Sequence, residues 1–166
     1  MNWIDIILGH GQVGTAIGEI LAVTSEKMFF IDPPKGDHGE HIDNPASRDI
    51  KQVKILHVCI PYSSDFEEIV VGWAKTYDSD VVIIHSTVLP GTTEHISAML
   101  DEEVVYSPIR GQHNDLTTSL KTKYTKCFAG MGEQAGLATK RFSDAGVKVR
   151  YFEDTNTLEW AKHISN

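Results

Sequence analysis

The stretch WIDIILGHGQVG, residues 3–14, decides the fold. A run of apolar, mostly β-branched residues ends directly in a glycine turn, and apolar side chains then recur at helical spacing up to residue 21. In a turn of this kind, the first glycine permits a tight bend, the second lets the backbone approach a phosphate, and the third lets the helix pack on the strand. The stretch therefore predicts a phosphate-binding strand–turn–helix unit around Gly9, Gly11 and Gly14.

The rest of the chain repeats the alternation of strand and helix. Strands are predicted at residues 3–8, 28–31, 53–60, 80–85, 104–106, 126–129 and 147–152, and helices at residues 13–21, 66–77, 92–100 and 133–145. A polar loop is expected from residue 35 to 47. The alternation predicts an α/β fold of the Rossmann type, a doubly wound and mostly parallel sheet with helices on both faces. In such sheets, ligands bind beyond the carboxyl ends of the strands.

The last residues of the chain form a separate element. Asn156 and Glu159 have the spacing of a helix N-cap and its N3 partner, and apolar residues follow at helical spacing. A helix that has barely begun at residue 166 is typical of an element that continues or docks on a partner. We therefore expect an α/β domain over residues 1–154 and the start of an interdomain or dimer helix over residues 155–166.

Composition excludes several classes of function. The 166 residues include 15 basic and 23 acidic side chains, a net charge of −8, which argues against binding nucleic acid or an anionic membrane. No apolar run approaches the roughly 18 residues of a membrane span, and the N-terminus lacks the basic region of a signal peptide. Cys59 and Cys127 lie in apolar runs and are expected to be reduced thiols of a cytoplasmic protein.

The strand ends suggest which dinucleotide binds. Asp32 ends the second predicted strand, where a carboxylate accepts hydrogen bonds from the adenosine ribose and repels a 2′-phosphate. NAD is therefore expected rather than NADP. The helix N-terminus at Gln12 and Val13 supplies amides and a positive dipole end for the phosphates. The other strand ends add Ile60, Pro61, Tyr62, Ser86 and Thr87 to the expected cofactor contacts. The alternative is a glycine turn that binds no ligand.

Three motifs resemble one family. HSTVLPGTTE (residues 85–94) resembles the S-T-V-x-P-G-T-T signature of the nucleotide-sugar dehydrogenases, the UDP-glucose/GDP-mannose dehydrogenase family. EWAKHISN (residues 159–166) is similar to the A-E-x-x-K-Y-x-x-N helix that joins the family's cofactor domain to its central domain. VCIPY (residues 58–62) is similar to the family's V-P-T-P turn. The resemblance covers the whole chain, but only the N-terminal domain of the family.

The resemblance implies hydride transfer from a UDP- or GDP-sugar to NAD. By this resemblance, Thr87 lies near the nicotinamide and helps to hold a catalytic water, while Lys162 and Asn166 stabilise developing oxyanion charge. The chemistry is sensible, because residues four apart share a helix face and a cation with an amide donor suits an alkoxide. The family's catalytic cysteine and central domain have no counterpart here. We therefore expect that this chain alone does not oxidise a sugar alcohol fully to the acid.

One loop departs from the family and leaves alternatives open. SPIRG (residues 107–111) stands where the family has a P-E-x motif, and it is similar to a loop of β-hydroxyacid and prephenate dehydrogenases. In a compact dehydrogenase of that type, working as a dimer, Arg110 and His113 would grip a substrate carboxylate. The third possibility is a stand-alone dinucleotide-binding module without catalysis.

Other polar residues are expected to have no catalytic or metal-binding role. Residues 37–43 contain two histidines and three acids, but no third ligand is fixed in space, so no metal site is expected. His57 and His85 fall within apolar strands and are expected to be structural.

Overall fold

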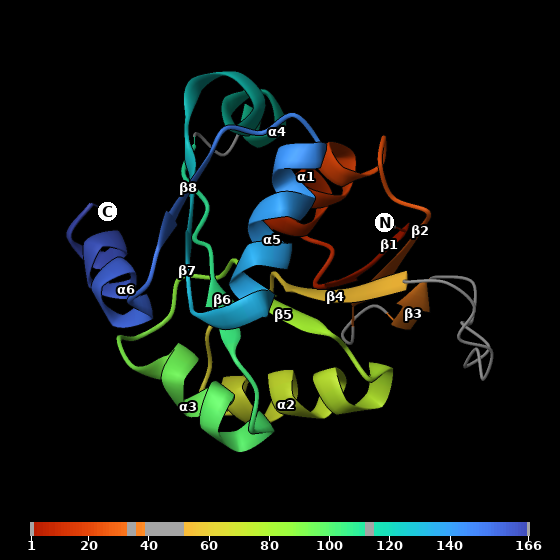
Figure 1. The fold of residues 1–166 in the computed structure, drawn as a ribbon. Coiled ribbons are helices and arrows are strands. Elements are labelled where there is room, and N and C mark those ends of the chain that lie inside the picture. Colours follow the sequence, from red (N-terminus) through yellow and green to blue (C-terminus); the bar gives the residue numbers. More distant parts are fainter. Residues whose placement is uncertain (1, 33–35, 39–51, 112–114, 166) are drawn as a thin grey trace.

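The protein is described by a computed structural model that covers residues 2–32, 36–38, 52–111 and 115–165. Within these ranges, one sheet has the strand order β3-β2-β1-β4-β5-β6-β7-β8 (Figure 1). The strands are β1 (Asn2–Leu8), β2 (Lys27–Asp32), β3 (Gly36–His38), β4 (Gln52–Val58), β5 (Val81–Ile84), β6 (Val104–Tyr106), β7 (Lys126–Ala129) and β8 (Val149–Phe152). Neighbouring strands are parallel except for the pairs β2–β3 and β6–β7. The predicted fold class is confirmed.

Helices cover both faces of the sheet (Figure 1). One face packs against α1 (Gln12–Leu21) and α5 (Gly132–Asp144), and the other against α2 (Phe66–Tyr77) and α3 (Thr92–Leu100). The short α4 (Leu116–Thr118) lies against α1 and continues into a π-helical turn, η2 (Ser119–Lys123). The last helix, α6 (Thr155–Ile164), packs on α3 and β6. None of the helices in the described part of the chain is long and apolar enough to cross a membrane.

The alternation of side chains along each strand builds two cores. In β1, Trp3 and Ile7 point to the α1/α5 face, while Ile6 and Leu8 point to the α2/α3 face. All four side chains are buried, and each contributes roughly 1.5–3 kcal/mol by leaving water. The nearly continuous apolar runs of the inner strands therefore follow from cover on both sides.

The order of the strands creates a crevice between β1 and β4. The chain runs outward from β1 to β2 and β3, then returns to place β4 on the other side of β1, with Leu8 opposite Val58. The connection after β1 leads to α1 on one face, and the connection after β4 leads to α2 on the other. The two connections therefore leave the carboxyl ends of β1 and β4 toward opposite faces of the sheet. Doubly wound sheets bind ligands at such a point.

One local prediction is wrong, and one helical segment was not predicted. The expected polar loop contains strand β3, whose His38 pairs with Phe30 of β2, and its polar sequence carries no apolar alternation that would reveal a strand. The rest of that loop, including residues 39–47, lies outside the described residues. The helical turns of residues 116–123 were not predicted either, because only Leu116, Ser119 and Leu120 are buried in them and their apolar stripe is very short.

Candidate functional site

The glycine turn after β1 is closed by close backbone contacts. Gly9 has φ +99°, in the left-handed region, and its N–H donates to the Ile31 carbonyl at 2.7 Å. A Cβ atom on Gly9 would lie 2.8 Å from the carbonyl oxygen of Cys59, and one on Gly14 would lie 1.9 Å from the carbonyl oxygen of Gly9. Neither position therefore accepts a side chain without moving the backbone. A Cβ on Gly11 would meet no atom within 4 Å, so this glycine faces open space.

The N-terminus of α1 points its backbone amides at this open space. Gly11 is the N-cap, no side chain caps the helix, and no acidic residue occupies its first turn. The positive end of the helix dipole is therefore available to an anion. Sequence reasoning missed a fourth glycine, Gly18, where a Cβ would lie 2.5 Å from the Phe30 ring. Its absence of a side chain brings α1 close to β2, and His10 stacks on the same Phe30 ring at 4.2 Å between centroids.

A cavity of about 810 Å³ opens beside the turn, within the size range of small-molecule and cofactor sites. Ten of the eleven predicted cofactor contacts line it: Gly9, Gly11, Gln12, Val13, Asp32, Ile60, Pro61, Tyr62, Ser86 and Thr87. The eleventh, Gly14, is buried behind the turn. The cavity is also lined by His10, Cys59, Ser63 and Ile69, which sequence reasoning did not include.

Hydrogen bonds fix the walls of the cavity. The Ser86 hydroxyl donates to the Ile60 carbonyl at 2.6 Å and so ties the loop after β5 to the loop after β4. Thr87, the next residue, is exposed and lines the cavity. Asp32 lies half-buried at the end of β2, on another part of the wall. The wall therefore combines carboxylate, hydroxyl and apolar groups around the N-terminal end of α1.

The start of α6 differs from its prediction. Asp154, not Asn156, is the N-cap, and it accepts a hydrogen bond from the Asn156 amide at 3.0 Å. Glu159 does not close a capping box on its own helix. Its buried carboxylate accepts hydrogen bonds from the Gly91 amide at 2.6 Å and from the Thr93 amide at 3.0 Å. These amides lie at the start of α3, so Glu159 satisfies another helix's N-terminus, a contact between residues more than sixty positions apart.

Two further contacts hold α6 against the loops of the sheet. The ring of His163 donates from Nε2 to the carbonyl of Val88 at 2.7 Å. Val88 directly follows Thr87 in the chain. The ammonium of Lys162 donates to the Ile109 carbonyl at 3.0 Å. Burial lowers the pKa of Lys162, and the positive charge of Arg110 lowers it further. Lys162 is therefore a partly desolvated cation placed beside the loops after β5 and β6.

The remaining predicted residues are placed only in part. Arg110 is exposed at the end of the loop after β6, near enough to Lys162 for their charges to interact. His113 and Asn166, predicted to contact the substrate and to stabilise an oxyanion, lie outside the described residues. Among the residues that the structure covers, no group of three His, Cys, Asp or Glu side chains is placed to hold a metal ion.

Comparisons with known proteins show the fold. No family model matches the chain, and no curated protein matches it either. Its structure is similar to a ternary complex of GDP-mannose dehydrogenase from Pseudomonas aeruginosa, with TM-score 0.68, 17% identity, and coverage of 98% of this chain and 49% of that one. It is also similar to Mycobacterium tuberculosis 3-hydroxyisobutyrate dehydrogenase with L-serine, with TM-score 0.67, 15% identity, and coverage of 99% and 59%.

A third similar structure is Psf3 in complex with NADP+ and 2-OPP, with TM-score 0.67, 17% identity, and coverage of 97% of this chain and 61% of that one. The chain thus spans about half to three-fifths of the length of each of these proteins. The comparisons therefore show that the chain shares its fold with part of each of these proteins.

Proposed function

We propose that this chain binds NAD and forms the cofactor-binding domain of a dehydrogenase. The observation that carries the proposal is the cavity at the β1/β4 crevice, which is lined by the first residues of α1, by Gly11 with its open surface and by Asp32. These are the groups that a dinucleotide needs for its pyrophosphate and ribose. Gly11 has no side chain and faces open space, so the cofactor's phosphates can approach the backbone there, while Gly9 and Gly14 keep the turn closed.

The protein groups would bind and orient, while the cofactor, once bound, supplies the hydride acceptor. The amides at the start of α1 hold the diphosphate, and Asp32 holds the ribose. Its negative charge disfavours a 2′-phosphate, which is our reason for preferring NAD although the similar Psf3 structure contains NADP+. Thr87 lines the cavity. The next residue, Val88, accepts a hydrogen bond from His163 of α6, and this bond holds the loop that carries Thr87 in place.

For the substrate, we propose a nucleotide sugar. The support is the HSTVLPGTTE loop together with the α6 residues that contact it, Glu159 and His163, an arrangement that holds Lys162 at the same edge of the sheet. In this proposal, Lys162 and Asn166 stabilise oxyanion charge and Thr87 orients a water. The chain spans only about half of the GDP-mannose dehydrogenase structure, so the complete reaction would need parts beyond these 166 residues.

Calorimetric titration with NAD and NADP tests the cofactor. We expect binding of NAD, with NADP weaker, and we expect Asp32→Ala to weaken NAD binding by roughly 1–3 kcal/mol through the loss of charge-assisted hydrogen bonds. Glu68→Ala is the matched control, because Glu68 is an exposed acid of α2 that does not line the cavity. An unchanged NAD dissociation constant in Asp32→Ala would remove Asp32 from the site.

A β-hydroxyacid or prephenate-type dehydrogenase is the second candidate. It is favoured by the closeness of Arg110 and Lys162, two cations suited to a substrate carboxylate, and by the similarity to 3-hydroxyisobutyrate dehydrogenase. NADH formation with UDP-sugars, GDP-sugars and hydroxyacids distinguishes the two substrates. Loss of turnover in Lys162→Ala would support a catalytic role for Lys162. NAD binding without turnover of any of these substrates would instead favour a cofactor-binding module.

We further propose that residues 1–154 form the cofactor domain and that residues 155–166 begin a helix toward another domain or chain. The support is that α6 leaves Trp160 56% exposed and Ile164 83% exposed, two apolar side chains one turn apart. A reducing, cytoplasmic location is proposed from the free thiols of Cys59 and Cys127.

A further inference from the structure

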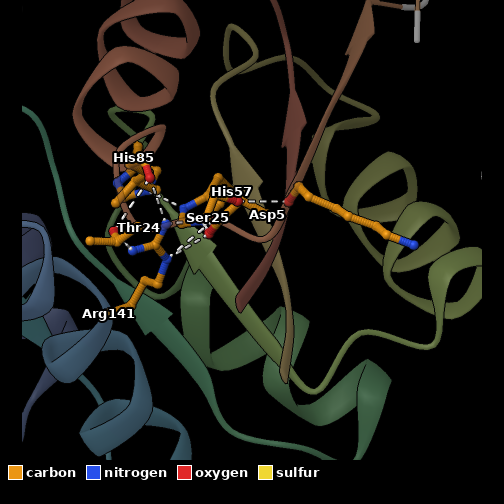
Figure 2. Close-up of polar contacts among 8 residues, drawn as sticks. Asp5, Thr24, Ser25, His57, His85 and Arg141 are labelled. Carbon is orange, nitrogen blue, oxygen red and sulfur yellow. Dashed lines mark hydrogen bonds and ion pairs between the residues drawn. The ribbon is translucent and has the colours of Figure 1, made fainter. Parts of the chain in front are cut away.

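Five ionisable side chains lie buried in one line across the α1/α5 face of the sheet. They are Asp5 on β1, His57 on β4, His85 after β5, Lys126 on β7 and Arg141 on α5, and each is at most 2% exposed. Figure 2 shows Asp5, His57, His85 and Arg141 gathered into one group with Thr24. None of them lines the cavity described above.

One end of the line is an ion pair. Arg141 donates from Nη2 to Asp5 Oδ2 at 2.6 Å and from Nε to Asp5 Oδ1 at 2.9 Å. Its Nη1 donates to the Thr24 hydroxyl at 2.7 Å. The ring nitrogen Nε2 of His57 lies 2.9 Å from Asp5 Oδ1. Because that oxygen belongs to an ionised carboxylate, His57 must carry a proton on Nε2 and donate it.

The line continues through two histidines to a lysine. His57 Nδ1 lies 3.1 Å from His85 Nε2, and His85 Nδ1 lies 3.2 Å from Lys126 Nζ. Lys126 Nζ also donates to the Ser107 carbonyl at 2.9 Å, and His85 Nδ1 lies 2.9 Å from the same oxygen. Every ring nitrogen therefore has a hydrogen-bonding partner within the group, and the contacts are unbroken from Lys126 to Asp5.

Two arrangements of the same protons satisfy this line. In the first, Lys126 is an ammonium that donates to His85 Nδ1, and His85 donates from Nε2 to His57 Nδ1. In the second, the N–H bond of Lys126 has broken and an N–H bond has formed at His85 Nδ1, while the proton of His85 Nε2 has moved to His57 Nδ1. His57 is then an imidazolium beside Asp5, and His85 donates from Nδ1 to the Ser107 carbonyl. The number of protons is the same in both.

We propose that Lys126, His85 and His57 form a buried chain that shares one excess proton, and that this proton sets how firmly the carboxyl ends of β5 and β6 are tied together beside the cofactor cavity. The tie runs from His85 through Lys126 to Ser107. His85 directly precedes Ser86 and Thr87 of the cavity wall, and Ser107 begins the loop that leads to Arg110. A charged Lys126 makes the stronger bond to the Ser107 carbonyl.

Electrostatics limits the chain to one proton. Burial lowers the pKa of Lys126 to about 7. Burial also lowers the pKa of His57 and of His85, and a positive charge on Lys126 lowers both further. A proton on one member therefore opposes a proton on the next. The other ionisable groups that face the chain are Asp5, Arg141, Cys59 and Cys127.

Nitrogen-15 NMR of the histidine side chains, without any ligand, tests the shared proton. We expect the ring nitrogens of His57 and His85 to shift together in a single step near neutral pH. In Lys126→Met, that step should be lost for both rings. Separate titrations of His57 and His85, or a joint step that persists in Lys126→Met, would overturn the proposal.

A second variant covers the case in which Lys126→Met does not fold. His85→Asn keeps an acceptor for Lys126 near the position of Nδ1 but has no group that reaches His57. We expect His57 to lose its joint step in this variant, and an unchanged His57 titration would contradict the shared proton.

The effect of the shared proton on the cofactor cavity rests on the proposed function and is measured separately, by NAD binding. We expect the NAD dissociation constant of the wild-type chain to change several-fold between pH 6 and pH 8.5, and that of Lys126→Met to change little. A wild-type constant independent of pH would remove the coupling to the cavity. Failure to bind NAD at every pH would overturn both the coupling and the proposed function, while the NMR result would still decide the proton chain.

Discussion

The two faces of the sheet differ in charge although both are built from the same strands. The described part of the protein has six buried Asp, Glu, His, Lys and Arg side chains, and five of them lie on the α1/α5 face. The sixth is Glu159 of α6, whose carboxylate contacts the start of α3. On the α2/α3 face, the strands contribute Ile6, Leu56 and Ile84 and similar apolar residues. Along β1, side chains therefore alternate between two cores: the core on the α2/α3 face is apolar, and the core on the α1/α5 face contains the line of charged residues.

The difference matters because the two kinds of core respond differently to a change. An apolar core loses free energy in proportion to the groups removed from it. A buried ion pair contributes little net stability compared with an apolar replacement of both partners, yet removal of one partner leaves a buried charge without compensation. The α1/α5 face should therefore be sensitive to single substitutions and to pH, and the α2/α3 face to volume alone.

Arg141→Met should produce the largest effect. It keeps much of the volume of the side chain but removes the guanidinium that pairs with the Asp5 carboxylate on both oxygens. We expect a loss of roughly 3–5 kcal/mol in the free energy of unfolding, measured by urea denaturation. Lys140→Met, one residue earlier on α5, is the matched control, because its ion pair with Asp144 is partly exposed and contributes only about 0–1 kcal/mol.

The double variant Asp5→Asn, Arg141→Met separates the pair from the packing. If the cost of Arg141→Met comes from an uncompensated carboxylate, removing that carboxylate should recover part of the lost free energy. If the double variant loses as much free energy of unfolding as the two single variants lose together, the two faces differ in packing rather than in charge.

The second effect is a dependence of stability on pH that originates on the α1/α5 face. Burial lowers the pKa of His57 and His85, so below about pH 6.5 the unfolded chain binds protons that the folded chain does not. Stability should fall as the pH decreases from 6.5, by up to about 1.4 kcal/mol per pH unit for each histidine. Lys126, with its pKa lowered to about 7, adds stability as the pH rises above 7.

Urea denaturation at several pH values between 5 and 8.5 measures this dependence. His57→Gln should reduce the slope below pH 6.5, because the amide of glutamine can still donate to Asp5 but does not titrate. An equal slope in His57→Gln and the wild type would assign the dependence to another group.

Much of the fold and of the candidate site could be predicted because both depend on local patterns. Helices α2 and α3 begin and end at the predicted residues, since their apolar spacing and flanking turns lie within the segment itself. The cavity wall was predicted for a related reason: strand ends of a parallel sheet meet at one edge, whatever the details of packing.

The charged line could not be predicted, because its contacts join distant residues. In the sequence, Asp5 is an acid that interrupts an apolar strand, and its partner Arg141 follows 136 residues later on a helix whose other charges are exposed. His57 and His85 were correctly placed in the core, but nothing in a single sequence indicates that they contact each other or Lys126. Glu159 was assigned to a cap on its own helix for the same reason: its true partners, the amides of α3, are not local.

The smallest expected effect tests whether the two faces are packed equally well. Ile6 and Ile7 are neighbours in β1, both are fully buried, and their side chains enter opposite cores. Each substitution to valine removes one methylene, so each should lower the free energy of unfolding by about 0.5–1.5 kcal/mol. Urea denaturation at pH 7.5 measures both, with the exposed Val23→Ala, expected within about 0.5 kcal/mol of wild type, as the control. Similar losses would assign the difference between the faces to charge, whereas a much larger loss for Ile7→Val would mean that the ionic line depends on the apolar side chains around it.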